Sequence, residues 1–304
     1  MSRKRLPGWL KRPLLPIWNA GHQFAWCARE HLDAARLGRF GWCEVCGRFG
    51  PRLYRRRVVP PKLEELWGLS PRLAAALARK ESTDCGWCGA KLRARRLARV
   101  VLDLYPVGTP PGPDRSIADW VRSAEAAALR VAEVNRIDGL HEVLDRLATL
   151  TFSDFDPSVP PGATVQGVRS EDLARLTYPD AAFDLVLTSE SLEHVPDFRA
   201  ALSEIRRVLA PGGRHVFTIP LLPGVATTYA RSMIRPDGAV EHIAPRIKHP
   251  GGDVGYPVFT EFGADFPEIL RQIGFEVNVL WWPPTEDDLA QVFVCRKPSA
   301  RRRE

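Results

Sequence analysis

The chain has 304 residues, of which 45% are hydrophobic and 26% are charged, an ordinary balance for a soluble globular protein. This length leaves room for a sizeable core and for two structural units. No run of about 18 apolar residues occurs, so a helix that spans a bilayer is not expected. Pro7, Pro13 and Pro16 interrupt the basic N-terminus, and no signal-peptide pattern follows it. The default expectation is therefore a cytoplasmic location.

The net charge of +7 is unevenly distributed along the chain. Residues 1–100 contain 22 basic and 7 acidic side chains, a net charge of +15, whereas residues 101–304 carry −8. A basic unit beside an acidic one suggests an anionic partner such as RNA for the first. Alternatively, the arginines reflect the base composition of the genome and form a solvated surface.

Residues 1–40 form a basic arm that also contains several aromatic side chains, among them Trp9, Trp18, Phe24 and Trp26. The prolines argue against one long helix. Tryptophan and arginine together suit a membrane surface or stacking on nucleic-acid bases. A third possibility is that the aromatic side chains pack onto the residues that follow.

Two short cysteine motifs of the same form define the next unit, the four-cysteine module (residues 41–106): CEVCG at 43–47 and CGWCG at 85–89. Two residues between thiols allow one tight turn to direct both sulfurs at the same ion, and four thiolates suit a structural Zn²⁺. The expected zinc ligands are Cys43, Cys46, Cys85 and Cys88. A redox dithiol or thiols that only pack are the alternatives. PRLAAALARKES, between the motifs, predicts a helix.

A further helix is expected over residues 91–104, and the Pro/Gly-rich stretch 107–114 is the best candidate for a linker. The catalytic domain would then span residues 115–298, followed by a charged tail at 299–304. Its first helix is predicted from Ser116, a favourable cap, through Ala128.

A series of strands and helices follows the linker. LRVAEV (129–134), TFSDFDP (151–157) and ATVQGV (163–168) are candidate strands, with a helix at 139–150 after the first. FDLVLT (183–188) is an apolar, partly β-branched run that suits a strand buried on both faces.

The next stretch completes a strand–helix–strand unit of a parallel sheet. Asp197 precedes FRAALSEIRRVLA, whose apolar residues recur at helical spacing, and Pro211-Gly212-Gly213 ends this helix. A second strand starts at Val216.

The remaining residues supply loops and the edge of the sheet. Residues 221–255 have scattered Pro and Gly and predict a loop-rich substrate lid. A helix is expected over 260–274, and FEVNVLWW (275–282) and QVFVCRKP (291–298) predict an antiparallel pair of strands. Cys295, in the last strand, is expected to be a small buried hydrophobe.

FDLVLTSESLEHVPD and EIRRVLAPGGRHVFTIP resemble the central part of class I S-adenosylmethionine-dependent methyltransferases, specifically the type 11-like members that methylate small molecules. The resemblance extends over roughly residues 115–296. It implies an α/β, Rossmann-like fold with a seven-stranded sheet, mostly parallel with an antiparallel last strand, beside the small N-terminal zinc-binding module. It also implies S-adenosylmethionine as the methyl donor.

The resemblance further implies which residues would meet the cofactor. Such methyltransferases have a glycine-rich turn after the first strand, whereas this sequence has NRIDG with a single glycine. Carboxylates at successive strand ends would bind the amino group, the ribose hydroxyls and the adenine amine. The cofactor-binding residues implied are Glu133, Gly139, Asp154, Asp172, Leu173, Ser189 and Glu190. Asp154 is preferred to Asp156 for the ribose; a purely structural Glu133 and helix capping around Asp172 are alternatives.

His194, just beyond the predicted fourth strand, is the candidate catalytic residue. Its imidazole titrates near neutrality, so it suits a base that removes the proton of a hydroxyl acceptor, or a group that orients the acceptor. The alternative is that His194 bonds the backbone of the Glu193–Pro196 turn. His249 with Asp253 is a weaker candidate pair.

The predicted function is methylation, most simply O-methylation, of a small molecule or saccharide with S-adenosylmethionine as donor and Zn²⁺ as a structural ion. The first alternative is an RNA base methyltransferase that grips phosphates with its basic module. The second is a non-catalytic binding protein whose cofactor site decayed with its glycine-rich turn. The sequence leaves the acceptor and the oligomeric state open.

Overall fold

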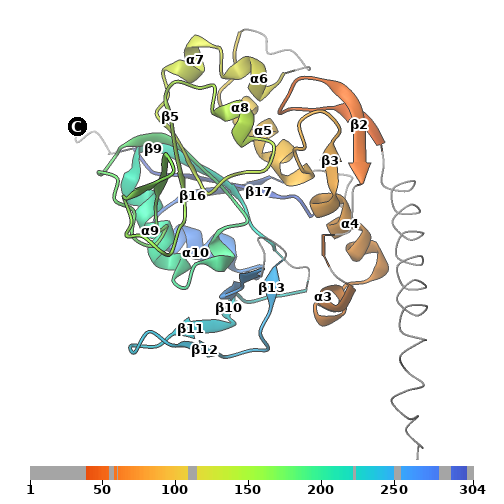
Figure 1. Cartoon of the computed structure of the whole chain (residues 1–304), viewed down its shortest axis with the longest axis vertical. Helices are drawn as coiled ribbons and strands as arrows, with labels where there is room; N and C mark the ends of the chain where they lie inside the picture. The colour runs from red at the N-terminus through yellow and green to blue at the C-terminus, as the bar shows by residue number, and fades with distance from the viewer. Residues whose placement is uncertain are drawn as a thin grey trace, which may run out of the picture.

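The computed structural model describes residues 39–54, 58–59, 61–108, 115–221, 224–249, 255–280 and 289–299. Most of the arm expected over 1–40, of the linker over 107–114 and of the tail over 299–304 lies outside these ranges. A twisted sheet with helices on both faces forms the main body (Figure 1). None of the helices in the described part of the chain has the length and apolar character needed to cross a membrane.

The central sheet has eight strands in the order β16-β17-β9-β8-β4-β5-β7-β6. Five neighbouring strands, β9-β8-β4-β5-β7, are parallel, whereas β17 runs antiparallel to both β9 and β16. The strands are β4 (Val131–Val134), β5 (Leu150–Asp154), β6 (Thr164–Val165), β7 (Val168–Ser170), β8 (Phe183–Ser189), β9 (Leu209–Thr218), β16 (Glu276–Leu280) and β17 (Val292–Arg296). This confirms the Rossmann-like sheet, to which β6 adds a two-residue antiparallel edge.

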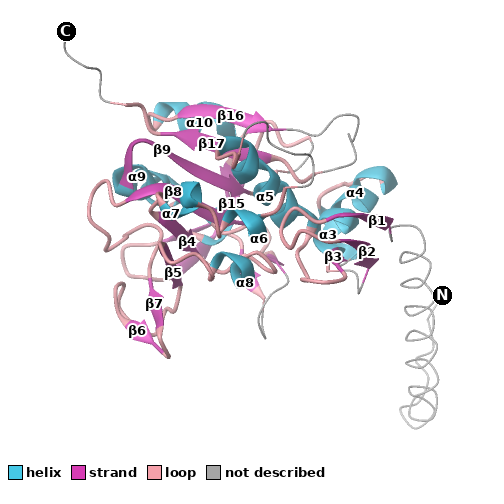
Figure 2. Cartoon of the chain, turned by 90° about the horizontal axis from the view of Figure 1, so that it is seen from above, coloured by secondary structure: helices cyan, strands magenta, loops and turns pink. Residues whose placement is uncertain are grey.

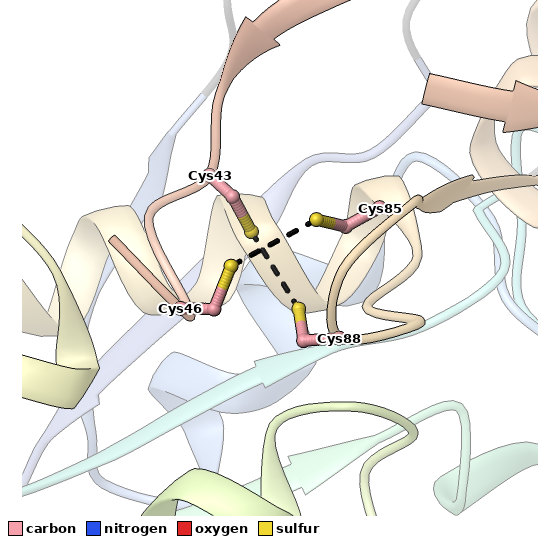
Figure 3. A group of neighbouring side chains, drawn as sticks. All are labelled: Cys43, Cys46, Cys85 and Cys88. Atoms are coloured by element: carbon pink, nitrogen blue, oxygen red, sulfur yellow. Dashed lines mark hydrogen bonds between the residues drawn. The ribbon is translucent and has the colours of Figure 1, made fainter. Parts of the chain in front are cut away.

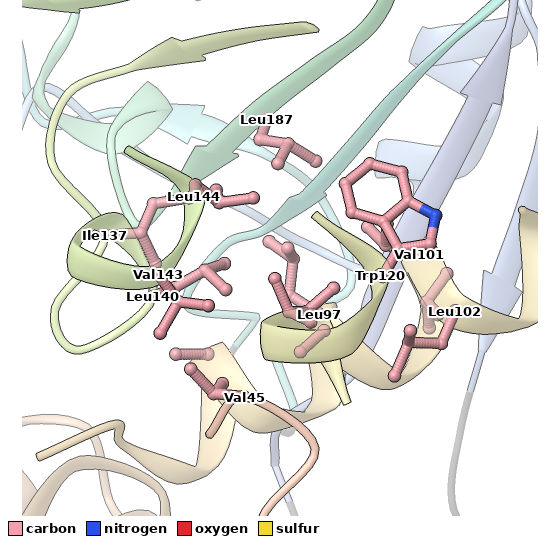
Figure 4. Close-up of a cluster of buried hydrophobic side chains, with 14 of the residues drawn as sticks. Val45, Leu97, Val101, Leu102, Trp120, Ile137, Leu140, Val143, Leu144 and Leu187 are labelled. Atoms are coloured by element: carbon pink, nitrogen blue, oxygen red, sulfur yellow. The ribbon is translucent and has the colours of Figure 1, made fainter. Parts of the chain in front are cut away.

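Side-chain alternation along the strands builds one hydrophobic cluster on each face of the sheet. On β8, Leu185 and Leu187 join the first cluster, whereas Val186 between them joins the second. Successive side chains of a strand point to opposite faces, so a strand covered on both faces must be apolar throughout. Figure 4 shows the first cluster, in which Trp120 lies near Leu187 and the helices that cover this face.

Helices complete the two outer layers. The first face is covered by α5 (Leu92–Leu104), α6 (Ile117–Trp120), α7 (Ala124–Ala127) and α8 (His141–Leu144). The second is covered by α9 (Phe198–Val208) and α10 (Phe266–Gln272). Asp197 caps α9, as expected, because its carboxylate accepts a hydrogen bond from the Ala200 N–H.

Several boundaries differ from the sequence-based expectation. The helix predicted over 116–128 is two single turns, because Ser123 starts a new cap by accepting from the Ala126 N–H. The helix predicted over 139–150 is likewise only the single turn α8. The third parallel strand is β7 rather than ATVQGV, whose Gln166 and Gly167 both have positive φ and form the β6–β7 turn. β9 starts at Leu209 and includes Pro211–Gly213 as an irregularity in its pairing with β8.

The four-cysteine module consists of a three-stranded antiparallel sheet and two helices before α5. Its elements are β1 (Arg39–Trp42), β2 (Phe49–Tyr54), β3 (Thr83–Cys85), α3 (Pro61–Leu66) and α4 (Pro71–Ser82). Cys43, Val45 and Cys85 belong to the same hydrophobic cluster as Trp120 and Leu144 of the main body. The module therefore shares a core with the sheet, and the expected linker does not separate two cores.

Three short antiparallel strand pairs form the hairpin region between β9 and α10 in the described part of the chain, and its role as a substrate lid stays a prediction. They pair β10 (Tyr229–Ala230) with β15 (Thr260–Glu261), β11 (Ser232–Ile234) with β12 (Val240–His242), and β13 (Lys248–His249) with β14 (Tyr256–Pro257). Leu63 of α3 and Leu77 of α4 share a third hydrophobic cluster with Ile247 and Val258 of this region. The module thus contacts the hairpin region. Figure 2 shows α3, α4 and β1–β3 grouped at one side of the sheet.

A buried histidine gives the fold a pH dependence. His215 on β9 is fully buried, its Nε2 lies 2.9 Å from Thr188 Oγ1, and burial lowers its pKa from 6.5 to about 3. Between these values the unfolded chain binds a proton that the folded protein excludes, so the free energy of unfolding falls as the pH falls through this window. From pH 6.5 to pH 5 we expect His215 to cost about 2 kcal/mol of stability. Urea unfolding of wild type and His215→Gln at pH 7 and pH 5 measures this; equal losses in both proteins would contradict it.

Candidate active site

Acidic side chains gather where the parallel strands end. Asp154 is the last residue of β5, Asp172 follows β7 by two residues, and Glu190 directly follows β8. Because β4, β5, β7 and β8 are all parallel neighbours, their carboxyl ends lie along one edge of the sheet. In open α/β sheets this edge is where ligands bind.

The loop after β4 keeps a tight turn although it has one glycine. Asn135 and Gly139 both have positive φ, 64° and 70°. Asparagine tolerates the left-handed conformation better than other residues with a Cβ. Its side-chain oxygen also accepts a hydrogen bond from the Phe155 N–H, which ties the loop to the end of β5. Asn135 therefore supplies a turn for which the resemblance implies glycine.

Glu133 holds this loop from the inside. Its side chain is fully buried, accepts a hydrogen bond from the Ile137 N–H at 2.9 Å, and lies 2.6 Å from Nδ1 of His141. Burial raises the pKa of Glu133, and the bonds from His141 and Ile137 partly offset this rise. Each carboxylate oxygen thus has a partner within the loop, and the contact expected with the cofactor's amino group stays a prediction.

Gly139 has a different role from the one the resemblance implies. A Cβ atom on it would lie 2.8 Å from the Cys88 carbonyl oxygen and still closer to the backbone of Ala90. The second cysteine motif therefore packs directly on the loop, and only glycine permits this approach. A cavity of about 380 Å³ adjoins this contact and is lined by Cys46, Arg48, Trp87, Cys88, Ala118, Gly139, Glu142, Val143 and Arg146.

The two carboxylates expected to bind the adenosine half remain partly exposed. Asp154 is half-buried, burial raises its pKa, and it accepts from the Phe155 N–H. Asp172 is also half-buried and accepts from the Ala174 N–H, while Leu173 beside it is buried in the second cluster. These groups keep a surface to offer a ligand, unlike Glu133.

A buried group of charges, the charged network (Lys80, Glu81, Arg93 and Glu190), joins the module to the end of β8. Lys80 Nζ lies 3.0 Å from Glu190 Oε1, and the lysine side chain is 2% exposed. Arg93 of α5 binds Glu81 and lies 3.7 Å from Asp138 in the loop after β4. The end of α4 is therefore held against the strand end where the expected site lies.

Mutual attraction favours the charged forms of Lys80 and Glu81 in this network. Burial by itself would lower the pKa of Lys80, but Glu190 and Glu81 raise it above its ordinary value. Burial would raise the pKa of Glu81, but Arg93 and Lys80 lower it to about 2. For Glu190, burial raises the pKa and Lys80 opposes the rise. Removing one partner would leave an uncompensated buried charge, which is strongly destabilising.

Beside this network lies the strand-end cluster, formed by Glu193, His194 and His249. His194 Nε2 lies 3.5 Å and His249 Nδ1 lies 3.6 Å from Glu193 Oε1. The other ring nitrogen of His194, Nδ1, lies 2.7 Å from the Pro257 carbonyl oxygen. His194 therefore bonds to the hairpin region rather than to its own turn. Asp253, the expected partner of His249, lies outside the described residues.

The remaining predicted residue, Ser189, is bound within the sheet. Its Oγ lies 2.8 Å from Thr218 Oγ1 on the neighbouring strand. Its position one residue before Glu190 still places its backbone at the same edge.

The four cysteines converge on one point, as Figure 3 shows. Cys43 Sγ lies 3.7 Å from Cys88 Sγ, and Cys46 Sγ lies 3.9 Å from Cys85 Sγ. These separations are too long for a disulfide, which needs about 2.05 Å. Four Zn–S bonds of about 2.3 Å in a tetrahedron place the sulfurs roughly 3.8 Å apart, so the donor set and its spacing fit Zn²⁺.

Comparison with known proteins supplies the family. A family model described as "Methyltransferase domain" matches residues 121–217. The demethylmenaquinone methyltransferase of Deinococcus radiodurans is 32% identical over 197 residues, which cover 55% of this chain and 77% of that protein. The chain belongs to the class I S-adenosylmethionine-dependent methyltransferases.

Two further relatives of this methyltransferase match shorter segments. The demethylmenaquinone methyltransferase of Corynebacterium urealyticum is 39% identical over 116 residues, 36% of this chain and 49% of that protein. The 27-O-demethylrifamycin SV methyltransferase of Amycolatopsis mediterranei is 51% identical over 122 residues, 40% of this chain and 37% of that protein. The chain thus spans about half or less of these two relatives.

The structure adds residues to the site that the sequence analysis did not identify. Lys80 and Arg93 come from the four-cysteine module, and Trp67 of the same module bonds Glu261 Oε1 through its ring N–H at 3.2 Å. Trp67 also contacts the ring of His249 edge-on, with centroids 5.9 Å apart. The sequence near the end of α4 does not indicate that its charged residues are enclosed. They become enclosed only because the module packs against the strand ends.

The contact at Gly139 can be tested with a matched glycine. Both Gly139→Ala and Gly167→Ala place alanine at positive φ, which costs about 1–2 kcal/mol. Only Gly139 faces other backbone atoms, whereas nothing lies within 4 Å of a Cβ at Gly167. We expect Gly139→Ala to lower the free energy of unfolding by about 1–3 kcal/mol more than Gly167→Ala does. Equal losses in urea unfolding would show that the module does not press on this loop.

Proposed function

We propose that this methyltransferase transfers the methyl group of S-adenosylmethionine to an oxygen of a small-molecule acceptor bound at the carboxyl edge of the sheet. The observation that carries methyl transfer to a small molecule is the similarity to a demethylmenaquinone methyltransferase over 77% of that protein's length, and the choice of oxygen rests on the relative named for 27-O-demethylrifamycin SV. The partly exposed carboxylates at successive strand ends support it, since they suit the ribose hydroxyls and adenine amine as acceptors.

Each proposed binding residue would contact a different part of the cofactor. Asp154 would accept from the ribose hydroxyls and Asp172 from the adenine amine, with Leu173 beside the ring. The loop from Asn135 to Gly139 would face the methionine end through its backbone, since Glu133 is engaged inside. Ser189 and Glu190 would border the same end. Bound there, the sulfonium supplies an activated methyl group, and positioning is worth roughly 7–11 kcal/mol.

His194 is the proposed catalytic residue at the acceptor. With its Nδ1–H donated to the Pro257 carbonyl, Nε2 carries a lone pair and can accept a hydrogen bond. It would take the proton of an acceptor hydroxyl or hold that hydroxyl in line. One fifth of its side chain is exposed, so an acceptor can reach it.

The names of the relatives favour a small-molecule acceptor. Two are named for demethylmenaquinone and one for 27-O-demethylrifamycin SV, and the last name specifies an oxygen. None of these three is named for an RNA or a saccharide, so neither acceptor gains support. Family membership likewise argues against a decayed, non-catalytic scaffold.

We further propose that the four cysteines bind a structural Zn²⁺. The zinc would fix the two cysteine motifs together and thereby hold the backbone of Cys88 and Ala90 against Gly139. Its contribution to function would be indirect, through the placement of the loop after β4.

The cofactor assignment predicts different effects for two neighbouring aspartates. Asp156 is partly exposed like Asp154, but its carboxylate is engaged with Ser158, so Asp156→Asn serves as the control. We expect Asp154→Asn to weaken binding of S-adenosylhomocysteine about 10- to 100-fold, because a hydrogen bond to a charged group is worth about 1.5–3 kcal/mol. Isothermal titration calorimetry measures this, together with methyl transfer. If both variants bind like wild type, Asp154 does not hold the ribose; if wild type itself does not bind, the proposed function is wrong.

The zinc assignment predicts a change in metal content. Cys88→Ser should lose one equivalent of zinc per chain and unfold at a lower temperature, because structural zinc contributes folding free energy. Cys295→Ala is the control, since Cys295 is buried in the second hydrophobic cluster on β17. Elemental analysis after gel filtration gives the stoichiometry. Equal zinc content in Cys88→Ser and wild type would contradict the assignment.

A further inference from the structure

The strand-end cluster differs from the acidic groups around it in one respect: within the described part of the chain its carboxylate faces two imidazoles, and no Lys or Arg side chain lies within ion-pair distance of it. Glu190 pairs with Lys80, Glu81 pairs with Arg93, and Glu261 pairs with Arg231 at 3.2 Å.

Glu193 is as deeply buried as any of these carboxylates, with 0% of its side chain exposed. Only the imidazoles of His194 and His249 approach it, and neither of its oxygens makes a hydrogen bond within the described part of the chain. An isolated buried carboxylate is costly unless it is paired or coordinates a metal.

The donor atoms are spaced as metal ligands would be. A tetrahedral ion with bonds of roughly 2.0–2.2 Å to nitrogen and oxygen separates neighbouring donors by roughly 3.3–3.5 Å. The two nitrogen-to-oxygen distances at Glu193 Oε1 are 3.5 and 3.6 Å, and one donor atom from each of the three residues lies within 4.8 Å of the others. Little movement would bring all three onto one ion.

The surroundings of His194 also match those of a ligand. Metal-binding histidines usually donate their second ring N–H to a carbonyl or carboxylate, which fixes the tautomer and aims the free lone pair. The Pro257 carbonyl takes this role for Nδ1 and leaves Nε2 facing Glu193. On the other side, Trp67 packs edge-on against the ring of His249 and limits its rotation.

We propose that Glu193, His194 and His249 bind one divalent first-row transition-metal ion, separate from the four-cysteine cluster. Two imidazoles and one carboxylate suit Zn²⁺, Fe²⁺ or Mn²⁺ better than Mg²⁺, which prefers oxygen ligands. Three protein ligands leave a position open, as in catalytic rather than structural zinc sites. His194 and His249 are 20% and 15% exposed, so this position is accessible from outside.

The role of the ion rests on the proposed function. In the open position it would bind the acceptor hydroxyl and favour loss of its proton to solvent. The oxygen would then form the new bond to the methyl carbon while the carbon–sulfur bond breaks and its electron pair stays on sulfur. His194 would act by orienting the acceptor through the metal, rather than as the base.

Metal content tests the site independently of activity. The full-length protein is saturated with Zn²⁺, freed of excess by gel filtration, and compared with Glu193→Gln and His249→Ala by elemental analysis. His242→Ala is the control, because His242 lies exposed on β12. Each cluster variant should hold one equivalent less than wild type and His242→Ala, with the equivalent at the cysteines retained. Equal zinc in all four proteins, with folding confirmed by circular dichroism, would overturn the proposal.

Measurements of methyl transfer then test whether the ion at this site takes part in the reaction. With a metal at the cluster, brief treatment with a chelator and re-addition of Zn²⁺ or Mn²⁺ should abolish and restore methyl transfer, while binding of S-adenosylhomocysteine stays unchanged. Activity that survives removal of the cluster metal would leave His194 as a simple base and overturn the catalytic role. If untreated wild type does not bind S-adenosylhomocysteine, the proposed function is refuted, whereas the metal site is not.

Discussion

The buried ion pair between Lys80 and Glu190 is the interaction on which the arrangement of this protein depends. The lysine belongs to the four-cysteine module and the glutamate to the end of β8; they meet at 3.0 Å, with the lysine side chain 2% and the glutamate side chain 14% exposed. A buried charge that loses its partner is strongly destabilising. Separating the module from the sheet would therefore leave Lys80 and Glu190 without compensation. The pair therefore fixes the module against the edge where the parallel strands end, and Arg93, Glu81 and Asp138 extend the connection to the loop after β4.

This attachment changes what the module contributes to the methyltransferase. Its cysteine motifs press on Gly139, its helix α5 covers one face of the sheet, and α3 and α4 contact the hairpins on the acceptor side. Trp67 reaches both Glu261 and His249. The module thus forms one wall of the candidate site, and it is not a remote docking domain. The same contact explains why Glu190 is largely enclosed and why a lysine of the module pairs with it, whereas Asp154 and Asp172 stay partly exposed.

A glycine-poor turn remains compatible with the fold because two other residues compensate for the missing glycines. Asn135 adopts the left-handed conformation and ties the loop to β5, while Glu133 satisfies the Ile137 N–H from beneath. The loop is consequently held by side chains from its own strand and by the module above it.

The sequence by itself determined the sheet, the helix α9 and the grouping of the four cysteines, because hydrophobic period, helix-start residues and Cys spacing are local properties of the chain. It also indicated His194 and the carboxylates at the strand ends, through a motif that is contiguous in the chain. Only the tertiary structure decided that Glu133 turns inward, that Gly139 serves the module, and that Lys80, Trp67 and His249 join the site. The bonds of Glu133 join residues 4 and 8 positions apart, but the other outcomes depend on contacts between residues about 50 or more positions apart. All of them depend on burial, which changes the energy of a charge and cannot be read from the neighbouring sequence.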